Sequence, residues 1–338
     1  MSVRVVIVGA GSWGTAMAVH LAARAHAAPA VTLCFRDAAQ AADTARVREN
    51  ARYLPGVALP AALSITADPA AAVAADIIII ATPVAALPGV VDQLRARGAS
   101  APLLWLCKGF VEVADARGGA LLAHQAIAPR WPAGVGVVSG PSFAGEVARA
   151  RPTALVVAAT DAALARMAAV MLRADALRVY ESDDIVGVEV GGAVKNVMAI
   201  AAGASDGLGF GHNARAALIT RGLAEIARLA VALGGRRETL MGLAGLGDLV
   251  LTATGDLSRN RRVGLALAAG DPLDAILSGL RHVAEGVTAA RATHALARHL
   301  HIEMPVTDAV FGVLYRQQNV RDAVEALMRR EPRREDAN

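Results

Sequence analysis

The sequence has little of several residue types on which particular protein classes depend. Two cysteines in 338 residues, Cys34 and Cys107, exclude a disulfide framework and the spacing of a zinc site. The most apolar segments, such as residues 77–81, have only the length of a strand, so we expect no membrane-spanning helix. The N-terminal segment lacks the apolar core and cleavage site of a signal peptide. We therefore expect a cytoplasmic protein that is not integral to a membrane and binds no metal.

Positive charge is not organised for binding nucleic acid. The net charge is +4, but the basic residues are scattered along helical segments. Arginines cluster at 329–334, yet acidic residues are interleaved with them, which is typical of a solvated tail. No nucleic-acid partner is expected.

Lysine is the scarcest basic residue. Of the 34 lysines and arginines, only Lys108 and Lys195 are lysines. A chain that otherwise uses arginine for positive charge is expected to keep lysine where a compact charge or an exchangeable proton is needed. Coincidence is the alternative for either lysine alone.

Strand-like and helical segments alternate up to about residue 182. The length indicates two domains, and the 55% of hydrophobic residues, many of them alanines, favour helices. The expected strands are 3–8, 31–35, 77–81, 103–106, 135–138 and 154–158, and the expected helices between them include 12–24, 84–97 and 118–127. Continuous apolar strands separated by helices predict an α/β fold: a Rossmann-type, doubly wound, mostly parallel sheet.

The pattern changes after residue 184, where helical segments and glycine-rich turns replace the strands. Asp183 or Asp184 is placed to cap a long helix that runs through Lys195. We expect an NAD(P)-binding domain at 1–184, an all-α substrate-binding and catalytic domain at 185–330 and a polar tail at 331–338.

A glycine motif follows the first strand. Gly9, Gly11 and Gly14 form G-x-G-x-x-G: the first allows a tight turn, the second lets the backbone approach a pyrophosphate, and the third lets helix and strand pack closely. In this strand–turn–helix context the motif predicts dinucleotide binding; a tight turn without a ligand is the alternative.

The residues at the end of the second strand bear on the choice of cofactor. Arg36 lies 22 residues after Gly14, where an arginine suits the 2′-phosphate of NADPH, so NADPH is favoured. Because Asp37 follows, NADH can be tolerated.

Two further segments end strands of the predicted sheet. Lys108 follows strand 103–106, and ligands of open α/β sheets bind beyond the carboxyl ends of strands, so this lysine is expected to face the cofactor. Residues 139–146 predict a turn into a helix whose free N–H groups hold a substrate or ribose oxygen. A plain capped helix start is the alternative for this segment.

Lys195 lies among apolar and small residues at 190–197. Such neighbours desolvate the amine, which lowers its pKa and makes proton exchange near neutrality plausible. A lysine that extends to the surface is the alternative.

A carboxylate and a basic segment follow in the helical half. Asp248 lies on a glycine-flanked turn, where it is placed to orient a lysine or accept a substrate hydroxyl. Arg259 between Ser258 and Asn260 predicts a multi-donor cradle for phosphate. A solvated helix face is the alternative.

Taken in order, these motifs closely resemble the NAD(P)-dependent glycerol-3-phosphate dehydrogenases of bacteria. The resemblance spans nearly the whole chain, and the motifs of the helical half are more specific than the glycine loop. The matching segments are GAGSWGTA at 9–16, KG at 108–109, SGPSFAGE at 139–146, GGAVKNV at 191–197, SDGLGFGHNARAALITRGLAE at 205–225, GLGDLVLT at 245–252, SRNRRVG at 258–264 and EG at 285–286.

The resemblance implies a role for each matching residue and a helical domain like the C-terminal domain of 6-phosphogluconate dehydrogenase. It implies that Lys195 is the general acid–base. The implied NADPH contacts are Ser12, Trp13, Arg36, Lys108, Ala144, Arg259, Val283 and Glu285. The implied substrate contacts are Lys108, Gly140, Ser142, Lys195, Asp248, Ser258, Arg259 and Asn260. Residues 25–30 lack the usual glycine turn, and position 36 is His or Arg among relatives, which leaves the ranking of NADPH over NADH open.

The implied reaction is the reversible reduction of dihydroxyacetone phosphate to sn-glycerol 3-phosphate, which supplies glycerophospholipid synthesis. Lys195 donates the proton, Lys108 stabilises the developing charge and Asp248 positions a lysine or a substrate hydroxyl. Two alternatives stay open: a hydroxyacid or ketoacid reductase of the same architecture, and a non-catalytic NADPH sensor. The alanine-rich helical domain could bury a dimer face, so a homodimer is expected.

Overall fold

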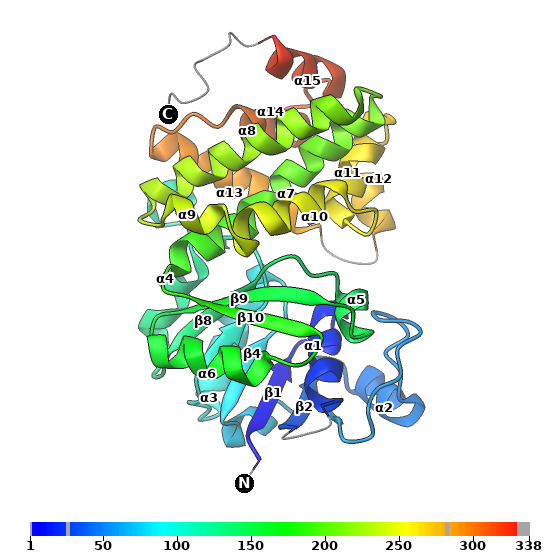
Figure 1. The fold of residues 1–338 in the computed structure, drawn as a ribbon, viewed down its shortest axis with the longest axis vertical. Coiled ribbons are helices and arrows are strands. Elements are labelled where there is room, and N and C mark those ends of the chain that lie inside the picture. The colour runs from blue at the N-terminus through cyan, green and yellow to red at the C-terminus, as the bar shows by residue number, and fades with distance from the viewer. Residues whose placement is uncertain (1, 25–27, 281–283, 330–338) are drawn as a thin grey trace.

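A computed structural model describes residues 2–24, 28–280 and 284–329 of the chain. Figure 1 shows two halves stacked along the long axis: the N-terminal half contains the sheet, and the C-terminal half consists of helices. The N-terminus lies at the end of the sheet half, and the last helix lies at the far end of the helical half (Figure 1). The predicted α/β half followed by a helical half is confirmed.

One eight-stranded sheet organises the N-terminal half, with strand order β10-β9-β8-β5-β4-β1-β2-β3. All neighbours pair in parallel except β8 and β9, as predicted for a mostly parallel sheet. The strands are β1 (Arg4–Val8), β2 (Ala30–Cys34), β3 (Ser64–Thr66), β4 (Ile77–Ile80), β5 (Leu103–Trp105), β8 (Val135–Ser139), β9 (Thr153–Ala159) and β10 (Leu177–Ser182).

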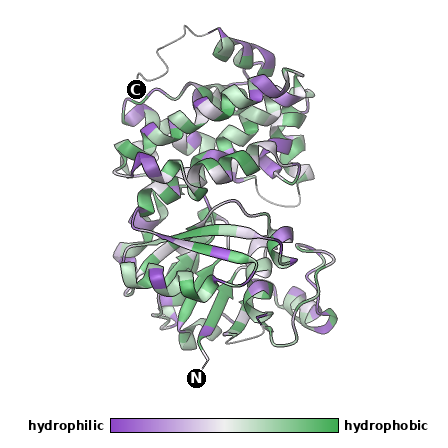
Figure 2. Cartoon of the chain, viewed as in Figure 1, coloured by the Kyte–Doolittle hydropathy of each residue, from purple (hydrophilic) through white to green (hydrophobic). Residues whose placement is uncertain are grey.

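Helices cover both faces of this sheet. Along β4, Ile77 and Ile79 belong to one buried cluster, whereas Ile78 and Ile80 belong to another. Because successive strand residues point to opposite faces, the two clusters are the two sides of one sheet. Figure 2 shows the central strands coloured as hydrophobic, as expected for strands buried on both faces. The helices of this half are α1 (Ser12–Ala22), α2 (Ala38–Val47), α3 (Leu87–Ala96), α4 (Ala123–Ile127), α5 (Ala144–Ala148) and α6 (Ala162–Leu172), with short 3₁₀ turns at Pro69–Ala74, Val84–Ala86, Arg117–Gly119 and Ala128–Arg130.

Some sequence expectations for this half are wrong. Strands β3 and β10 are absent from the predicted series; both lie at sheet edges, and β10 alternates buried and exposed residues instead of forming an apolar run. The helix expected at 118–127 begins only at Ala123. Gly118 and Gly119 have φ angles of 75° and 72°, which a helix does not accept, and the next two residues pair as β7 (Ala120–Leu121) with β6 (Val111–Glu112).

The C-terminal half is built around one long central helix. Its described regular elements are α7 (Ile185–Gly207), α8 (Gly211–Ala232), α9 (Arg237–Leu240), a π turn (Leu243–Gly247), α10 (Asp248–Thr254), α11 (Arg259–Ala268), α12 (Leu273–Gly279), α13 (Glu285–His299), α14 (Pro305–Tyr315) and α15 (Val320–Met328). Asp184 caps α7, as one of the two predicted candidates, by accepting a 2.8 Å hydrogen bond from the Gly187 N–H.

Helix α7 is longer and more apolar than any segment expected from the sequence. By length and composition alone this helix could cross a bilayer. However, 89% of that segment is buried inside the protein, between the other helices. Its apolar character is therefore accounted for by the protein core.

Glycines allow α11 to pack on α7 backbone to backbone. A Cβ at Gly203 would overlap the Arg261 carbonyl oxygen, and a Cβ at Gly264 would overlap the Ile200 carbonyl oxygen. This close approach fixes the first turn of α11 relative to the helix that carries Lys195.

A buried carboxylate joins α8 to α14. Glu225 is 2% exposed and accepts hydrogen bonds from the backbone N–H groups of Val306 (2.7 Å) and Thr307 (3.1 Å).

We predict that Glu225→Ala lowers the free energy of unfolding by about 2–4 kcal/mol, because both buried donors lose their partner. Urea denaturation measures this. The control Glu325→Ala removes an exposed ion pair with Arg329 and should cost less than about 0.5 kcal/mol. Equal losses in the two variants would contradict the capping role.

Candidate functional site

The glycine loop leaves its backbone open at one position only. Gly9 has a φ of 111°, and a Cβ there would lie 2.8 Å from the Ala81 carbonyl carbon. A Cβ at Gly14 would overlap the Gly9 carbonyl oxygen. A Cβ at Gly11 would meet no atom within 4 Å, and no side chain caps α1 there. Open space beside a free helix N-terminus fits a pyrophosphate, so the loop fits a dinucleotide.

The other residues expected to contact the cofactor near α1 have different surroundings. The Ser12 hydroxyl donates a 2.6 Å hydrogen bond to the Tyr53 carbonyl oxygen, and Trp13 is half-buried. Arg36 is exposed just after the carboxyl end of β2. Asp37 caps α2 by accepting a 2.8 Å hydrogen bond from the Gln40 N–H. Because this carboxylate already has a structural partner, Arg36 is the freer of the two to contact a ribose substituent.

Three residues that are distant in sequence meet at the junction of the two halves. Lys108 follows β5, Lys195 lies in the middle of α7, and Asp248 is the first residue of α10. Lys108 Nζ lies 2.5 Å from Asp248 Oδ2, and Lys195 Nζ donates to Asp248 Oδ1. Asp248 is 1% exposed and Lys195 is 6% exposed, so Lys195 is buried and does not extend to the surface.

Close backbone packing brings Asp248 to Lys195. In the π turn before Asp248, a Cβ at Gly245 would overlap the Leu240 carbonyl oxygen, and a Cβ at Gly191 of α7 would lie 2.5 Å from the Ala244 carbonyl oxygen. The expected glycine-flanked turn is therefore present, and it packs closely against α7.

Sequence analysis missed Thr252. Its hydroxyl accepts a 2.9 Å hydrogen bond from Lys195 Nζ and donates a 2.6 Å bond to the Asp248 carbonyl oxygen. The signal that could have found it is the i, i+4 spacing from Asp248, which places both side chains on one face of α10.

Burial dominates the electrostatics of this cluster. It lowers the pKa of Lys195 to about 7; repulsion from Lys108 acts in the same direction, and attraction to Asp248 opposes it. Burial alone would raise the pKa of Asp248, but the two lysines outweigh it and hold that pKa below its usual value. An amine with a pKa near 7 can exchange a proton at neutral pH.

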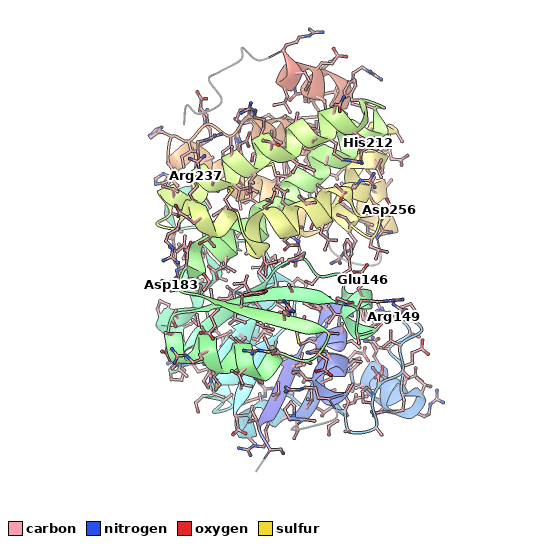
Figure 3. The ribbon with its side chains drawn as sticks, viewed as in Figure 1. Glu146, Arg149, Asp183, His212, Arg237 and Asp256 are labelled. Carbon is pink, nitrogen blue, oxygen red and sulfur yellow. The ribbon has the colours of Figure 1, made fainter. Side chains whose placement is uncertain are left out.

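The turn after β8 lies beside Lys108. Lys108 Nζ also donates to the Gly140 carbonyl oxygen at 3.3 Å, and the Ser142 hydroxyl donates to the same oxygen at 3.1 Å. Gly140 has a φ of 124°, and Ala144 begins α5 without a side-chain cap. Figure 3 shows Glu146 of α5 and Arg149, the residue after this helix, on the edge of the sheet half that faces Asp256 of the helical half.

In the structure, Ser258 and Asn260 of the expected phosphate cradle at 258–260 take part in structural hydrogen bonds. Ser258 caps α11 by accepting a 3.2 Å hydrogen bond from the Arg261 N–H. The buried Asn260 amide donates to Asn196 Oδ1 at 2.9 Å and accepts from the Gly286 N–H at 3.0 Å. The Arg261 guanidinium pairs with Asp206 at 2.7 Å. Adjacent residues of a helix point in different directions, so these side chains do not form one fork.

Arg259 and Glu285 remain near the lysine cluster. Arg259 is the exposed first residue of α11, and Glu285 is the half-buried first residue of α13. Burial raises the pKa of Glu285, whereas attraction to Arg259, Lys108 and Lys195 opposes that rise. Val283 lies outside the described residues. Among the described residues, no group of three or more His, Cys, Asp or Glu side chains is placed to hold a metal ion.

Comparisons with known proteins agree with this geometry. Residues 4–165 match the family model of the NAD-dependent glycerol-3-phosphate dehydrogenase N-terminus, and residues 184–325 match that of its C-terminus. A relative from Aromatoleum aromaticum, named glycerol-3-phosphate dehydrogenase [NAD(P)+], is 54% identical over 98% of this chain and 100% of its own. A relative of the same name from Methylibium petroleiphilum is 55% identical over 98% of each chain.

A solved structure has the same fold over nearly the whole chain. It is the crystal structure of glycerol-3-phosphate dehydrogenase from Coxiella burnetii, with a TM-score of 0.91 and 38% identity, covering 97% of this chain and 99% of that one. The family models, the relatives and this fold all lead to one assignment: the chain belongs to the NAD-dependent glycerol-3-phosphate dehydrogenase family.

Proposed function

We propose that this protein catalyses the reversible, NAD(P)-dependent reduction of dihydroxyacetone phosphate to sn-glycerol 3-phosphate. The observation that carries the proposal is the buried Lys195–Asp248–Lys108 cluster. It lies at the sheet edge that also holds the glycine loop, since β1, β4 and β5 are neighbouring parallel strands whose carboxyl ends meet there. The names of the family and of the relatives support this substrate and cofactor.

Each member of the cluster has a distinct role in this proposal. The bound dinucleotide supplies or accepts the hydride. Lys195, as the ammonium, donates a proton to the oxygen that becomes a hydroxyl, and as the amine it takes that proton back in the reverse direction. Asp248 holds the amine in place, and Lys108 stabilises the negative charge that develops on the oxygen.

Further residues hold the substrate and cofactor in this proposal. Arg259 binds the substrate phosphate, with Asn260 beside it and Ser258 fixing the helix start. Gly140 and Ser142 contact the substrate next to Lys108. The proposed dinucleotide contacts are Gly9, Gly11, Ser12, Trp13, Gly14, Arg36, Lys108, Ala144, Arg259, Val283 and Glu285.

The proposal extends to organisation and setting. We place the domain boundary near residue 184, between the last strand and α7, with a polar tail at 331–338. NADPH is proposed as the preferred cofactor because Arg36, and not an acidic residue, is the second residue after β2. We also propose that the enzyme is a homodimer, that it is cytoplasmic, and that its product supplies glycerophospholipid synthesis.

Two glycine variants test cofactor binding separately from stability. We predict that Gly11→Ala keeps the melting temperature but weakens NADPH binding at least about tenfold, because the methyl group enters only the space of the pyrophosphate. Gly14→Ala, its matched control, should lose about 1–3 kcal/mol of stability because its methyl group overlaps Gly9. Fluorescence titration and thermal unfolding measure the two effects. Unchanged NADPH affinity in Gly11→Ala would place the pyrophosphate elsewhere.

Replacing Lys195 tests the proton donor. We expect Lys195→Met to lose about 10²–10⁴-fold in kcat while NADPH affinity stays the same, because only the proton transfer is removed. Asp248 keeps Lys108 as a partner in this variant, so the fold should survive. The absorbance of the reduced nicotinamide measures turnover. A kcat near that of the wild type would exclude Lys195 as the donor.

The two directions of the reaction should depend on pH in opposite ways. With a Lys195 pKa of about 7, the ammonium form disappears as pH rises, so kcat for reduction should fall through pH 7. Oxidation needs the amine as a base, so its kcat should rise over the same interval. In Lys195→Met both dependences should vanish. Parallel pH profiles for the two directions of the wild-type enzyme would contradict the mechanism.

Arg259→Ala tests phosphate recognition and separates this function from that of a ketoacid reductase. A charge-assisted hydrogen bond to phosphate is worth about 1.5–3 kcal/mol, so kcat/KM for dihydroxyacetone phosphate should fall about 10–100-fold. Because Arg259 is also a proposed dinucleotide contact, both ketones are assayed at saturating NADPH, where activity on unphosphorylated dihydroxyacetone should fall much less. Arg262→Ala is the control on the same helix, since Arg262 lies in a groove against α12. Equal losses on both ketones would contradict a phosphate contact.

A further inference from the structure

A small cavity lies beside Lys108, between the sheet, α4 and α7. The cavity volume is about 10 Å³. Such a volume holds about one water molecule. The polar residues that line it are Lys108, Ser139 and Glu189.

Ser139 presents an unsatisfied group to this cavity. The residue is the last of β8 and is 2% exposed, and its hydroxyl oxygen has no hydrogen-bond partner in the protein. A buried hydroxyl without a partner costs free energy, so such groups usually bind an internal water.

Glu189 brings a second polar group and a contact between the two halves. It is 5% exposed on α7, and its carboxylate accepts hydrogen bonds from the His124 backbone N–H at 3.1 Å and pairs with His124 Nδ1 at 2.6 Å. Trp105 also faces this carboxylate and acts to lower its pKa. Because His124 lies on α4, this pair ties α7 to the sheet half.

Gly192 links the cavity to the lysine cluster along α7. It lies three residues from Glu189 and three from Lys195, so it neighbours both on the helix surface, although Glu189 and Lys195 lie about 120° apart around the helix. A Cβ at Gly192 would lie 3.1 Å from Ser139 Oγ and 3.4 Å from Lys108 Cγ. The aliphatic part of Lys108 is thus held between Gly192 and the cavity.

We propose that Glu189 is a positioning residue for the reaction: with Ser139 it binds one buried water beside Lys108, and its bond to His124 fixes the register of α7 against the sheet half. The water is the hydrogen-bond partner that the Ser139 hydroxyl lacks, and it contacts the Lys108 side chain at the cavity. The tie to α4 sets where α7 presents Lys195 relative to Lys108. This inference rests on the proposed function, because it concerns the geometry of the same two lysines.

The charge on Glu189 is set by several groups that face it. His124 faces it from α4, Trp105 from β5, and Lys108 lies across the cavity. Cys107 lies at the same cavity; burial raises the pKa of its thiol, and the carboxylates of Glu285 and Glu189 act in the same direction. Burial raises the pKa of Glu189 itself, and the bonds from His124 oppose that rise. Protonation of Glu189 at low pH therefore weakens the tie to His124.

Glu189→Gln tests the positioning role, with Glu112→Gln as its matched control. Glu112 also bridges the two halves, through an exposed ion pair with Arg291, but it lies away from the cavity. We expect Glu189→Gln to lower kcat about 10–100-fold with unchanged Kd for NADPH, because a small displacement of reacting groups has effects of this size. Glu112→Gln should leave kcat unchanged.

The pH profile separates positioning from general stability. In the wild-type enzyme, kcat for reduction should fall at acid pH, where Glu189 takes up a proton, and Glu189→Gln should lack this acid limb. The alkaline fall through Lys195 should remain in the variant. An acid limb that persists in Glu189→Gln, or a kcat equal to that of Glu112→Gln, would overturn the inference. If kcat for reduction in the wild-type enzyme did not fall at alkaline pH, that result would instead count against the proposed function.

Ser139→Ala keeps the proposal testable if Glu189→Gln does not fold. The hydroxyl has no partner in the protein, so this variant should fold normally. A high-resolution crystal structure of the wild type should show a water within hydrogen-bond distance of Ser139 Oγ and Glu189. Ser139→Ala should lose that water and several-fold of kcat. A dry cavity in the wild type, or full kcat in Ser139→Ala, would overturn the inference.

Discussion

The ionised carboxylate of Asp248 is the interaction on which the rest of the site depends. Two lysine amines lie against one carboxylate that is 1% exposed. Without that carboxylate, two positive charges would be buried next to each other, and repulsion added to desolvation would disfavour both. With it, attraction opposes the effect of burial and the pKa of Lys195 is about 7, so the amine keeps a proton that it can exchange near neutral pH while a partner holds it in place. One buried charge thus serves both structure and chemistry.

Small residues make this burial geometrically possible. Gly191 lets the turn before Asp248 contact α7, and Gly203 and Gly264 let α11 do the same on the other side. Any larger side chain at these positions would move a helix away and open the cluster to solvent, where the pKa of a lysine returns towards its ordinary value. The apolar, glycine-rich composition of α7 is therefore a requirement of the chemistry as well as of packing.

The site also joins the two halves of the molecule. Lys108 comes from the sheet half, whereas Lys195 and Asp248 come from the helical half, so the bonds that form the site are also bonds between halves. The His124–Glu189 pair also joins the halves, six residues before Lys195 on α7. In the proposed mechanism the hydride donor and the proton donor are held by different halves, so contacts that fix the halves relative to each other also fix the reacting groups.

Local patterns in the sequence determined the mostly parallel sheet, the glycine loop, the Asp184 cap and the choice of both lysines and Asp248, because spacing and residue type carry that information. The edge strands β3 and β10 were not predicted from local patterns because they lack an apolar run. Only the tertiary structure decided that Thr252 and Glu189 belong beside the cluster, and that Asn260 bridges three helices instead of joining a fork with its neighbours. These contacts join residues more than 20 positions apart, and their partners depend on how α7, α11 and α13 cross, which no local pattern encodes.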